Sequence, residues 1–256
     1  KRPPLTGFSI IEMVDEYRGE PETEFVQGLP FNTYLVRQVH AFALQPGQYK
    51  VEAAEVSSNV HLIKVDDALN RIPFDEKIVS KSNELDVDVK PLPPDQPENF
   101  SGAVGNYEVS MKANLSEIHP GDLVKVVITV KGRGNIPLLI PPIVQWPKEV
   151  DTADPVVREE YNKYLSPLEG QKTFEYSFTA PDTGHYLIPA AVFSFFDPSV
   201  GKYKISQSDS LDLLVIAGES KSTIGAPEAI PTTTNSNRQM YWFAVVVLAI
   251  VSWIAY

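Results

Sequence analysis

The stretch GHYLIPAAVF, at Gly184–Phe193, decides the fold because it has a near copy, GQYKVEAAEV, at Gly47–Val56. Both copies read Gly-x-Tyr-x-(Val or Ile)-x-Ala-Ala, and both begin at the glycine of a turn sequence, PDTG or QPG. Glycine permits the positive φ of such a turn, the alternating Tyr and Val/Ile face a core, and paired alanines allow close sheet packing. The repeat therefore predicts two related β domains in tandem.

Alternation of apolar and polar residues dominates the chain around the second copy. It runs through YEVSMKANLS (Tyr107–Ser116), LVKVVITVKG (Leu123–Gly132) and KTFEYSFTA (Lys172–Ala180), and SLDLLVI (Ser210–Ile216) closes the series. A period of two is typical of half-buried strands. Short strands with turn sequences between them predict an antiparallel, immunoglobulin-like β-sandwich over residues 106–217.

One segment of this second domain has a helical pattern. In DPVVREEYNKYL (Asp154–Leu165), Asp154 is a suitable N-cap and Pro155 suits the first helical position. Acidic Glu159 and Glu160 precede Lys163, as at the start of a helix. We expect a surface helix near residues 154–165.

The first half of the chain repeats part of the same plan. NTYLVRQVHAFAL precedes the first copy as KTFEYSFTA precedes the second, and LDVDV (Leu85–Val89) matches LDLLV (Leu211–Val215). Almost no chain stands before RPPLTGF, whereas several strands precede the similar IPPIVQW (Ile140–Trp146). We expect a first sandwich over residues 1–90 without its opening strands. A proline-rich, semi-rigid linker is expected over residues 91–105.

The C-terminal segment predicts a membrane anchor. Residues 218–239 are rich in Ser, Thr, Pro and Gly, which is typical of a flexible tether, and residues 240–256 are almost wholly apolar. We expect a single transmembrane helix over 240–256. These residues are too few to span the bilayer, so the helix is expected to continue beyond them. Its aromatic residues are suited to the membrane interfaces: Tyr241, Trp242, Trp253 and Tyr256.

Composition argues against several classes of function. The formal net charge of −11 argues against binding nucleic acid, and the absence of cysteine removes disulfides and thiolate chemistry. The four histidines, His40, His61, His119 and His185, show no metal-ligand or catalytic spacing, and His119 and His185 adjoin turns where solvent exposure is the simplest expectation. We therefore predict a protein that is not an enzyme and holds no cofactor or metal.

Several long motifs resemble the BatD family of bacterial oxygen-tolerance (aerotolerance) proteins. They are PLPPDQPENFSGAVGNYEV (Pro91–Val109), VKGRGNIPLLIPPI (Val130–Ile143) and the stretch from Lys172 to Tyr203, followed by SLDLLV. The resemblance implies an inner-membrane protein with its sandwich domains in the periplasm. It further implies a scaffold that assembles with von Willebrand A-domain membrane proteins (BatA/BatB-like) and, through them, a MoxR-type AAA+ ATPase.

Candidate partner-binding residues lie in two places. GRGN predicts a tight turn whose Gly132, Gly134 and Asn135 leave the backbone open to a partner. The long excursion that follows carries an aromatic residue and three carboxylates that could reach the metal of a von Willebrand A domain: Trp146, Glu149, Asp151 and Asp154.

Two further hypotheses remain open. DTA and DSL resemble an O-glycosylation acceptor used on exported bacterial proteins, which makes Thr152 and Ser210 candidates for modification. A glycan-binding or adhesive module on a membrane tether is the alternative to a scaffold. It requires an exposed aromatic platform, and Trp146 is the sole tryptophan outside the C-terminal segment.

Overall fold

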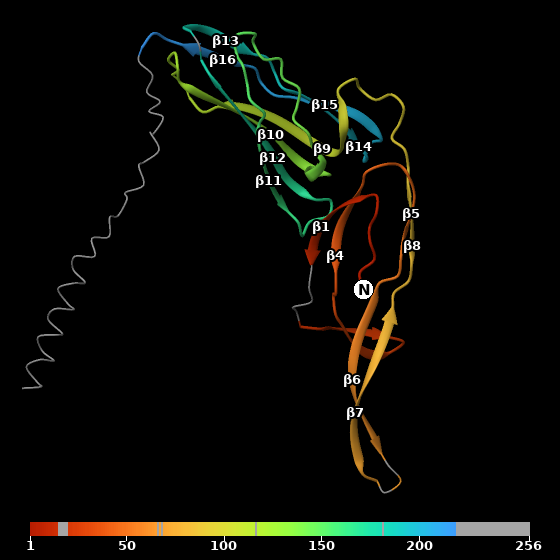
Figure 1. The fold of residues 1–256 in the computed structure, drawn as a ribbon. Coiled ribbons are helices and arrows are strands. Elements are labelled where there is room, and N and C mark those ends of the chain that lie inside the picture. The colour runs from red at the N-terminus through yellow and green to blue at the C-terminus, as the bar shows by residue number, and fades with distance from the viewer. Residues whose placement is uncertain (15–19, 66, 68, 116, 181, 219–256) are drawn as a thin grey trace, which may run out of the picture.

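The protein is almost entirely β-structure. The computed structural model describes residues 1–14, 20–65, 67, 69–115, 117–180 and 182–218. These residues form sixteen strands and one short 3-10 turn, η1 (Ile136–Leu138), and contain no α-helix. We call the part built from β1 to β8 the first unit and the part built from β9 to β16 the second unit. Figure 1 shows the two units following one another, with the β6–β7 hairpin extending away from the second unit.

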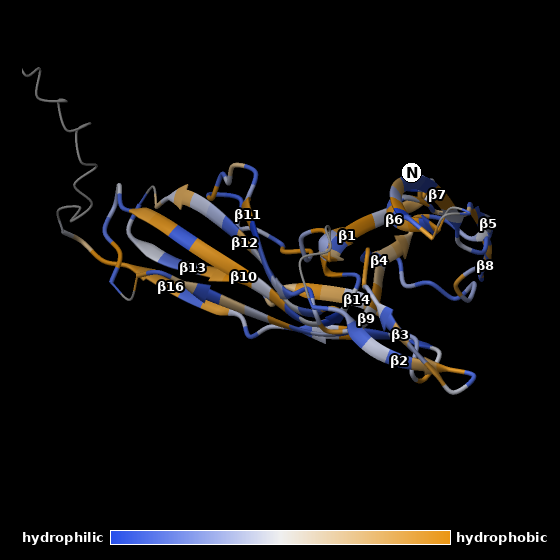
Figure 2. Ribbon diagram, turned by 90° about the horizontal axis from the view of Figure 1, so that it is seen from below, coloured by the Kyte–Doolittle hydropathy of each residue, from blue (hydrophilic) through white to orange (hydrophobic). Residues whose placement is uncertain are grey.

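The second unit holds the main hydrophobic core. Six strands form one sheet in the order β11-β12-β10-β9-β14-β15, and β13 and β16 form a separate pair. Alternate residues of β10 are fully buried, from Val124 to Val130, and side chains of both sheets meet in one apolar cluster. Figure 2 shows β10 as a largely apolar strand with hydrophilic residues at intervals. The strands are β9 (Phe100–Ala113), β10 (Leu123–Gly134), β11 (Val156–Asn162), β12 (Glu169–Thr179), β13 (Gly184–Ile188), β14 (Val192–Asp197), β15 (Lys202–Gln207) and β16 (Leu211–Val215).

The helix expected near residues 154–165 is wrong, because Val156–Asn162 is the edge strand β11. It pairs with β12, and its charges find partners across the strands: Glu159 contacts Lys172 at 2.7 Å and Arg158 contacts Glu175 at 3.3 Å. Glu159, one of the residues that suggested a helix, therefore belongs to a cross-strand pair. Sheet pairing overrides the local helical pattern here.

The first unit consists of four separate strand pairs, β1-β4, β2-β3, β5-β8 and β6-β7. Its buried side chains among the described residues are Met13 and His40 alone. The strands are β1 (Phe8–Val14), β2 (Glu22–Val26), β3 (Leu29–Thr33), β4 (Gln38–Ala43), β5 (Gly47–Val51), β6 (Glu55–Val65), β7 (Arg71–Lys81) and β8 (Leu85–Val89).

The repeated sequence folds in the same way in both units. Gly47 pairs with Val89 and Gly184 with Val215, so β5-β8 and β13-β16 share one register. Gly47 and Gly184 both have a φ of 151°, a value that favours glycine, as the turn sequence predicts.

Two hydrogen bonds are also duplicated. The Tyr49 hydroxyl donates to the Gln45 carbonyl at 2.9 Å, and the Tyr186 hydroxyl donates to the Asp182 carbonyl at 3.0 Å. The alanine that ends each copy donates its backbone N–H to a serine hydroxyl, at 2.9 Å from Ala54 and 3.0 Å from Ala191. The repeat thus specifies turn, register and side-chain hydrogen bonds together.

The two tyrosines are expected to differ in their contribution to stability. Tyr186 is buried whereas Tyr49 is half-buried, so water can replace the lost hydroxyl only at Tyr49. We expect Tyr186→Phe to lower the free energy of unfolding by about 1 kcal/mol and Tyr49→Phe by clearly less. Urea denaturation of the two variants measures both changes, and equal losses would contradict the expected difference in solvent access.

Candidate functional site

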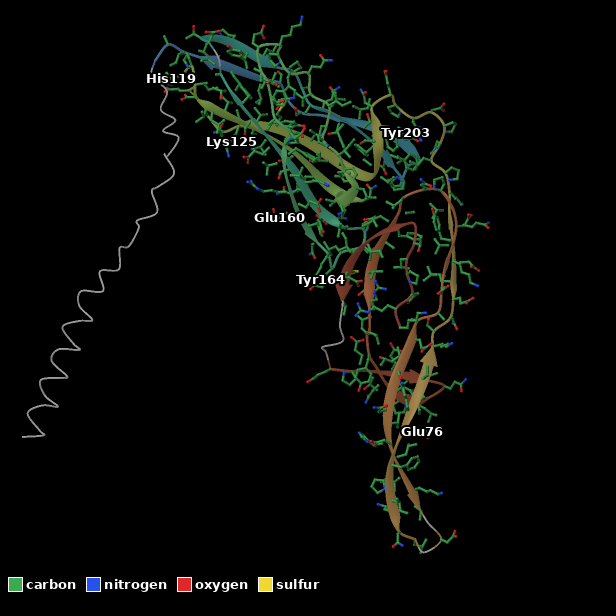
Figure 3. The ribbon with its side chains drawn as sticks, viewed as in Figure 1. Glu76, His119, Lys125, Glu160, Tyr164 and Tyr203 are labelled. Carbon is green, nitrogen blue, oxygen red and sulfur yellow. The ribbon has the colours of Figure 1, made fainter. Side chains whose placement is uncertain are left out.

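A cleft of about 910 Å³ lies where the two units meet. One wall is the end of β4 and the turn after it, from His40 to Pro46. The other walls come from the start of β9, the end of β10 and the β14–β15 turn of the second unit. Tyr164 lies at this junction (Figure 3). Residues of both units line the cleft.

Contacts from both units fix the walls of the cleft. His40 Nε2 lies 2.9 Å from the Lys163 carbonyl oxygen, which joins β4 to the loop before β12. Ile11 and Phe42 pack against the core of the second unit. The Tyr203 hydroxyl donates to the Pro93 carbonyl at 2.7 Å and holds the proline-rich segment on β15.

Asn135 forms a buried polar network on the second-unit side of the cleft. Its Oδ1 accepts the Val104 N–H at 2.8 Å and the Tyr107 hydroxyl at 3.1 Å, while its Nδ2 donates to the Gly102 carbonyl at 2.9 Å. Burial raises the pKa of Tyr107, so its hydroxyl remains a donor at neutral pH. The amide thus ties the beginning of β9 to the end of β10.

The tight turn expected at Gly132–Asn135 is wrong, because β10 continues to Gly134. Gly132 faces Tyr107 on β9 and Gly170 on β12, and a Cβ there would lie 2.0 Å from the Asn106 carbonyl oxygen. Gly134 has a φ of 144° and lies opposite Gly105. These glycines permit close strand packing. Of the residues predicted to bind a partner, Gly134 and Asn135 line the cleft.

Asp197 is the one carboxylate among the described residues that line the cleft. It is buried, and its Oδ2 accepts the Lys204 ammonium at 2.7 Å while its Oδ1 accepts the Ser199 hydroxyl at 2.6 Å. The hydrogen bond from Lys204, followed by that from Ser199, lowers the pKa of Asp197 to about 2. The carboxylate is therefore ionised, and it joins Lys204 of β15 to Ser199 of the β14–β15 turn.

This pKa predicts sensitivity to acid. Because the folded-state pKa lies below the ordinary value of 3.8, the ionised carboxylate stabilises the fold at neutral pH, and this contribution is lost as the pH falls from about 4 towards 2. We expect Asp197→Asn to be less stable than wild type at pH 7 and to lose less stability over that acid range. Urea midpoints at several pH values measure the change, with exposed Asp209→Asn as control. A variant with the wild-type pH slope would contradict the assignment.

The remaining predicted partner-binding residues lie away from the cleft. Trp146 is half-buried and packs on Tyr176, with ring centroids 5.0 Å apart. Glu149, Asp151 and Asp154 are exposed on the segment before β11. Within the described parts of the chain, no group of three or more His, Asp or Glu side chains is arranged to hold a metal ion.

The two candidate glycosylation residues are both outside strands. Thr152 is half-buried on the segment before β11, and Ser210 is exposed immediately before β16. O-glycosylation at either position stays a prediction.

The histidines are dispersed, and one differs from expectation. His185 is near Asp212 at 3.2 Å, and His61 pairs with Asp75 on the β6–β7 hairpin. The exposure expected for His119 is wrong, because this residue is buried. The bridge between the neighbouring Ile118 and Val215 places the His119 ring against Gly218. A Cβ on Gly218 would lie 2.3 Å from the His119 ring, so glycine makes the room for it. His40 is the histidine that lines the cleft.

The predicted anchor lies outside the described residues. This applies to the whole of 240–256, including Tyr241, Trp242, Trp253 and Tyr256, and to nearly all of the tether. Across residues 1–218, wherever the structure describes them, no helix has the length and apolar character that a membrane crossing requires.

The sequence did not predict the cleft or the part of its wall that comes from the first unit. His40 and Leu44 stand in an ordinary alternating strand, and nothing in their spacing predicts that β4 meets the second unit. The proline-rich linker was the available signal, because a stiff connection holds two domains in a preferred orientation. Comparisons with protein-family models, curated proteins and solved structures found no match to this chain.

Proposed function

We propose that this chain is a non-enzymatic, membrane-anchored scaffold of the BatD type, whose tandem immunoglobulin-like sandwich units bind other membrane proteins at the periplasmic face of the bacterial inner membrane. The partners are von Willebrand A-domain membrane proteins and, through them, a MoxR-type AAA+ ATPase. The role is in envelope stress or oxygen tolerance. The C-terminal segment holds the units at the bilayer, which raises the effective concentration of membrane partners.

The observation that carries the proposal is the cleft of about 910 Å³ between the units. It presents exposed apolar side chains such as Leu44, which is 58% exposed. Such a surface suits binding of polypeptide, where a few apolar anchors supply most of the binding energy. The half-buried Trp146 gives no comparable support to an adhesive, glycan-binding module.

The test is co-purification from gently solubilised membranes with two matched variants. Leu44→Glu places a charge in the cleft, and Leu187→Glu places one at an equally exposed residue on β13. We expect wild type and Leu187→Glu to recover von Willebrand A-domain proteins in a fixed ratio, and Leu44→Glu to recover about ten-fold less. Wild-type protein that is isolated alone, or with glycans, would overturn the scaffold.

A further inference from the structure

The large sheet of the second unit ends on one side at β11, which has a free edge. β11 is the outermost strand of the six-stranded sheet, and it pairs with β12 on one side. No strand among the described residues pairs with its other side, and Figure 1 shows β11 at the border of the second unit. The first unit has the same plan, because β1 is the outermost strand beside β4, the counterpart of β12. The outermost position of β11 is therefore part of the repeated plan.

Apolar side chains of β11 are exposed on both faces of the sheet. Val157 stands opposite Phe174, which is 1% exposed, and yet Val157 itself is 46% exposed. Val156, on the other face, is 54% exposed. Because Val157 lies on the core side of the sheet, its exposure shows that the described residues leave the edge uncovered. An uncovered edge with apolar side chains is a template for pairing with another strand.

The sequence of β11, VVREEYN, complements itself in antiparallel pairing. A two-fold axis through Glu159 places Arg158 of each copy opposite Glu160 of the other, and Val157 opposite Tyr161. The first pair joins opposite charges, and the second joins a β-branched residue to an aromatic one, both of which are favourable across strands. The symmetry makes each pair occur twice.

The present contacts of Arg158 and Glu160 leave both side chains able to form the pair. The Arg158 side chain is 68% exposed and reaches Glu175 at 3.3 Å, while Glu175 has a closer partner in Lys125 at 2.7 Å. Glu160 accepts a hydrogen bond from the neutral amide of Gln171 at 3.0 Å. Figure 3 shows Glu160 at the border of the second unit, where a second copy would approach.

Glu159 would lie opposite its own copy on the axis, and like charges in that position destabilise a sheet. In each chain, however, the Glu159 carboxylate lies 2.7 Å from the ammonium of Lys172, whose side chain is 9% exposed. Lys172 also donates to the Pro137 carbonyl at 2.9 Å, which fixes its position. Each Glu159 is therefore neutralised within its own chain and directed toward β12, away from the axis.

A shift of the axis by one residue gives worse pairs in either direction. With the axis through Arg158, this arginine meets its own copy and Val157 meets Glu159. With the axis through Glu160, this glutamate meets its own copy and Glu159 meets Tyr161. Both shifts oppose like charges and place a carboxylate against an apolar or aromatic side chain. The charges therefore select the axis through Glu159.

We propose that β11 pairs antiparallel with β11 of a second copy of this chain, in the register that places Glu159 on the two-fold axis. The six-stranded sheets of the two copies then form one continuous sheet across the dimer. Backbone hydrogen bonds between the two edges provide affinity, and the pairs of Arg158 with Glu160 determine the register. This inference goes beyond the scaffold function and does not rest on it.

The first test is disulfide formation at single positions of the full chain in detergent. The chain contains no cysteine, so a single cysteine substitution reports on the register without background. Directly opposite residues have Cα atoms about 4.5–5.5 Å apart, within the range of a disulfide, whereas diagonal neighbours are about 7–8 Å apart. We expect Glu159→Cys to give about ten-fold more disulfide-linked dimer than the matched controls Arg158→Cys and Glu160→Cys.

The second test is charge reversal, measured by sedimentation equilibrium of the full chain in density-matched detergent. Arg158→Glu and Glu160→Arg should each weaken the dimer about ten-fold, because each opposes like charges twice. The double variant opposes unlike charges again and should associate like wild type. It does not repair the lost contact of Arg158 with Glu175, so its recovery would be specific to the contact between copies.

Three results would overturn the proposal. The first is a wild-type chain that stays monomeric at every concentration. The second is equal disulfide formation at the three positions, which would show that the copies meet through another surface. The third is a double variant that associates as weakly as the single variants, because residues 158 and 160 would then not meet across the axis.

Discussion

Asn135→Leu is expected to lower the free energy of unfolding of the second unit by about 3 kcal/mol. The substitution removes the buried amide, so the Val104 N–H loses its acceptor and the Gly102 carbonyl loses its donor. Each backbone group left unsatisfied costs about 1–3 kcal/mol. The Tyr107 hydroxyl is less affected, because it also donates to the Val104 carbonyl at 3.1 Å.

Urea denaturation followed by circular dichroism measures this loss, and Tyr107→Phe is the matched control. Tyr107→Phe removes one donor from the network and keeps the amide in contact with both backbone groups, so its loss should be smaller than that of Asn135→Leu. A leucine variant as stable as wild type would show that Asn135 is not needed to hold β9 to β10. Asn135 would then have the partner-binding role that the sequence suggested and not a role in stability.

The strands and their pairing in the repeated segments were predictable from the sequence. Gly184 and Gly47 mark the turns, and the alternation after each glycine gives a strand with one less exposed face, buried in β13 and half-buried in β5. The match of Leu85–Val89 with Leu211–Val215 correctly predicted the closing strands β8 and β16. These features depend on contacts between neighbouring segments, which period and turn chemistry determine directly.

Features that depend on distant contacts were not predictable. Val156–Asn162 has a helical arrangement of charges, and its strand form depends on β12 offering an edge. The hydrogen bonds of Asn135 could not be predicted from the sequence, because Gly102 and Val104 lie close to Asn135 only once β9 pairs with β10. The cleft likewise exists because His40 meets the Lys163 carbonyl of the other unit. Local patterns contain no information on which edges meet.

Ile188→Asp and Val51→Asp change the same position of the repeat, and we expect them to differ most in the stability that they remove. Ile188 is fully buried, so a carboxylate there loses its hydration and lies in an apolar core. The cost is several kcal/mol, comparable with the whole stability of a domain, and the second unit should be largely unfolded at 25 °C. Val51 is half-buried in a unit with few buried side chains, so Val51→Asp should cost about 1 kcal/mol or less.

Amide exchange measured peptide by peptide distinguishes the stability of the first unit from that of the second in the intact chain. Ile188→Val is the control, because it changes the volume of the side chain without adding charge. Exchange throughout β9–β16 should become fast in Ile188→Asp, whereas Val51→Asp should leave that region unchanged. Similar losses from both aspartates would show that Val51 is covered in solution.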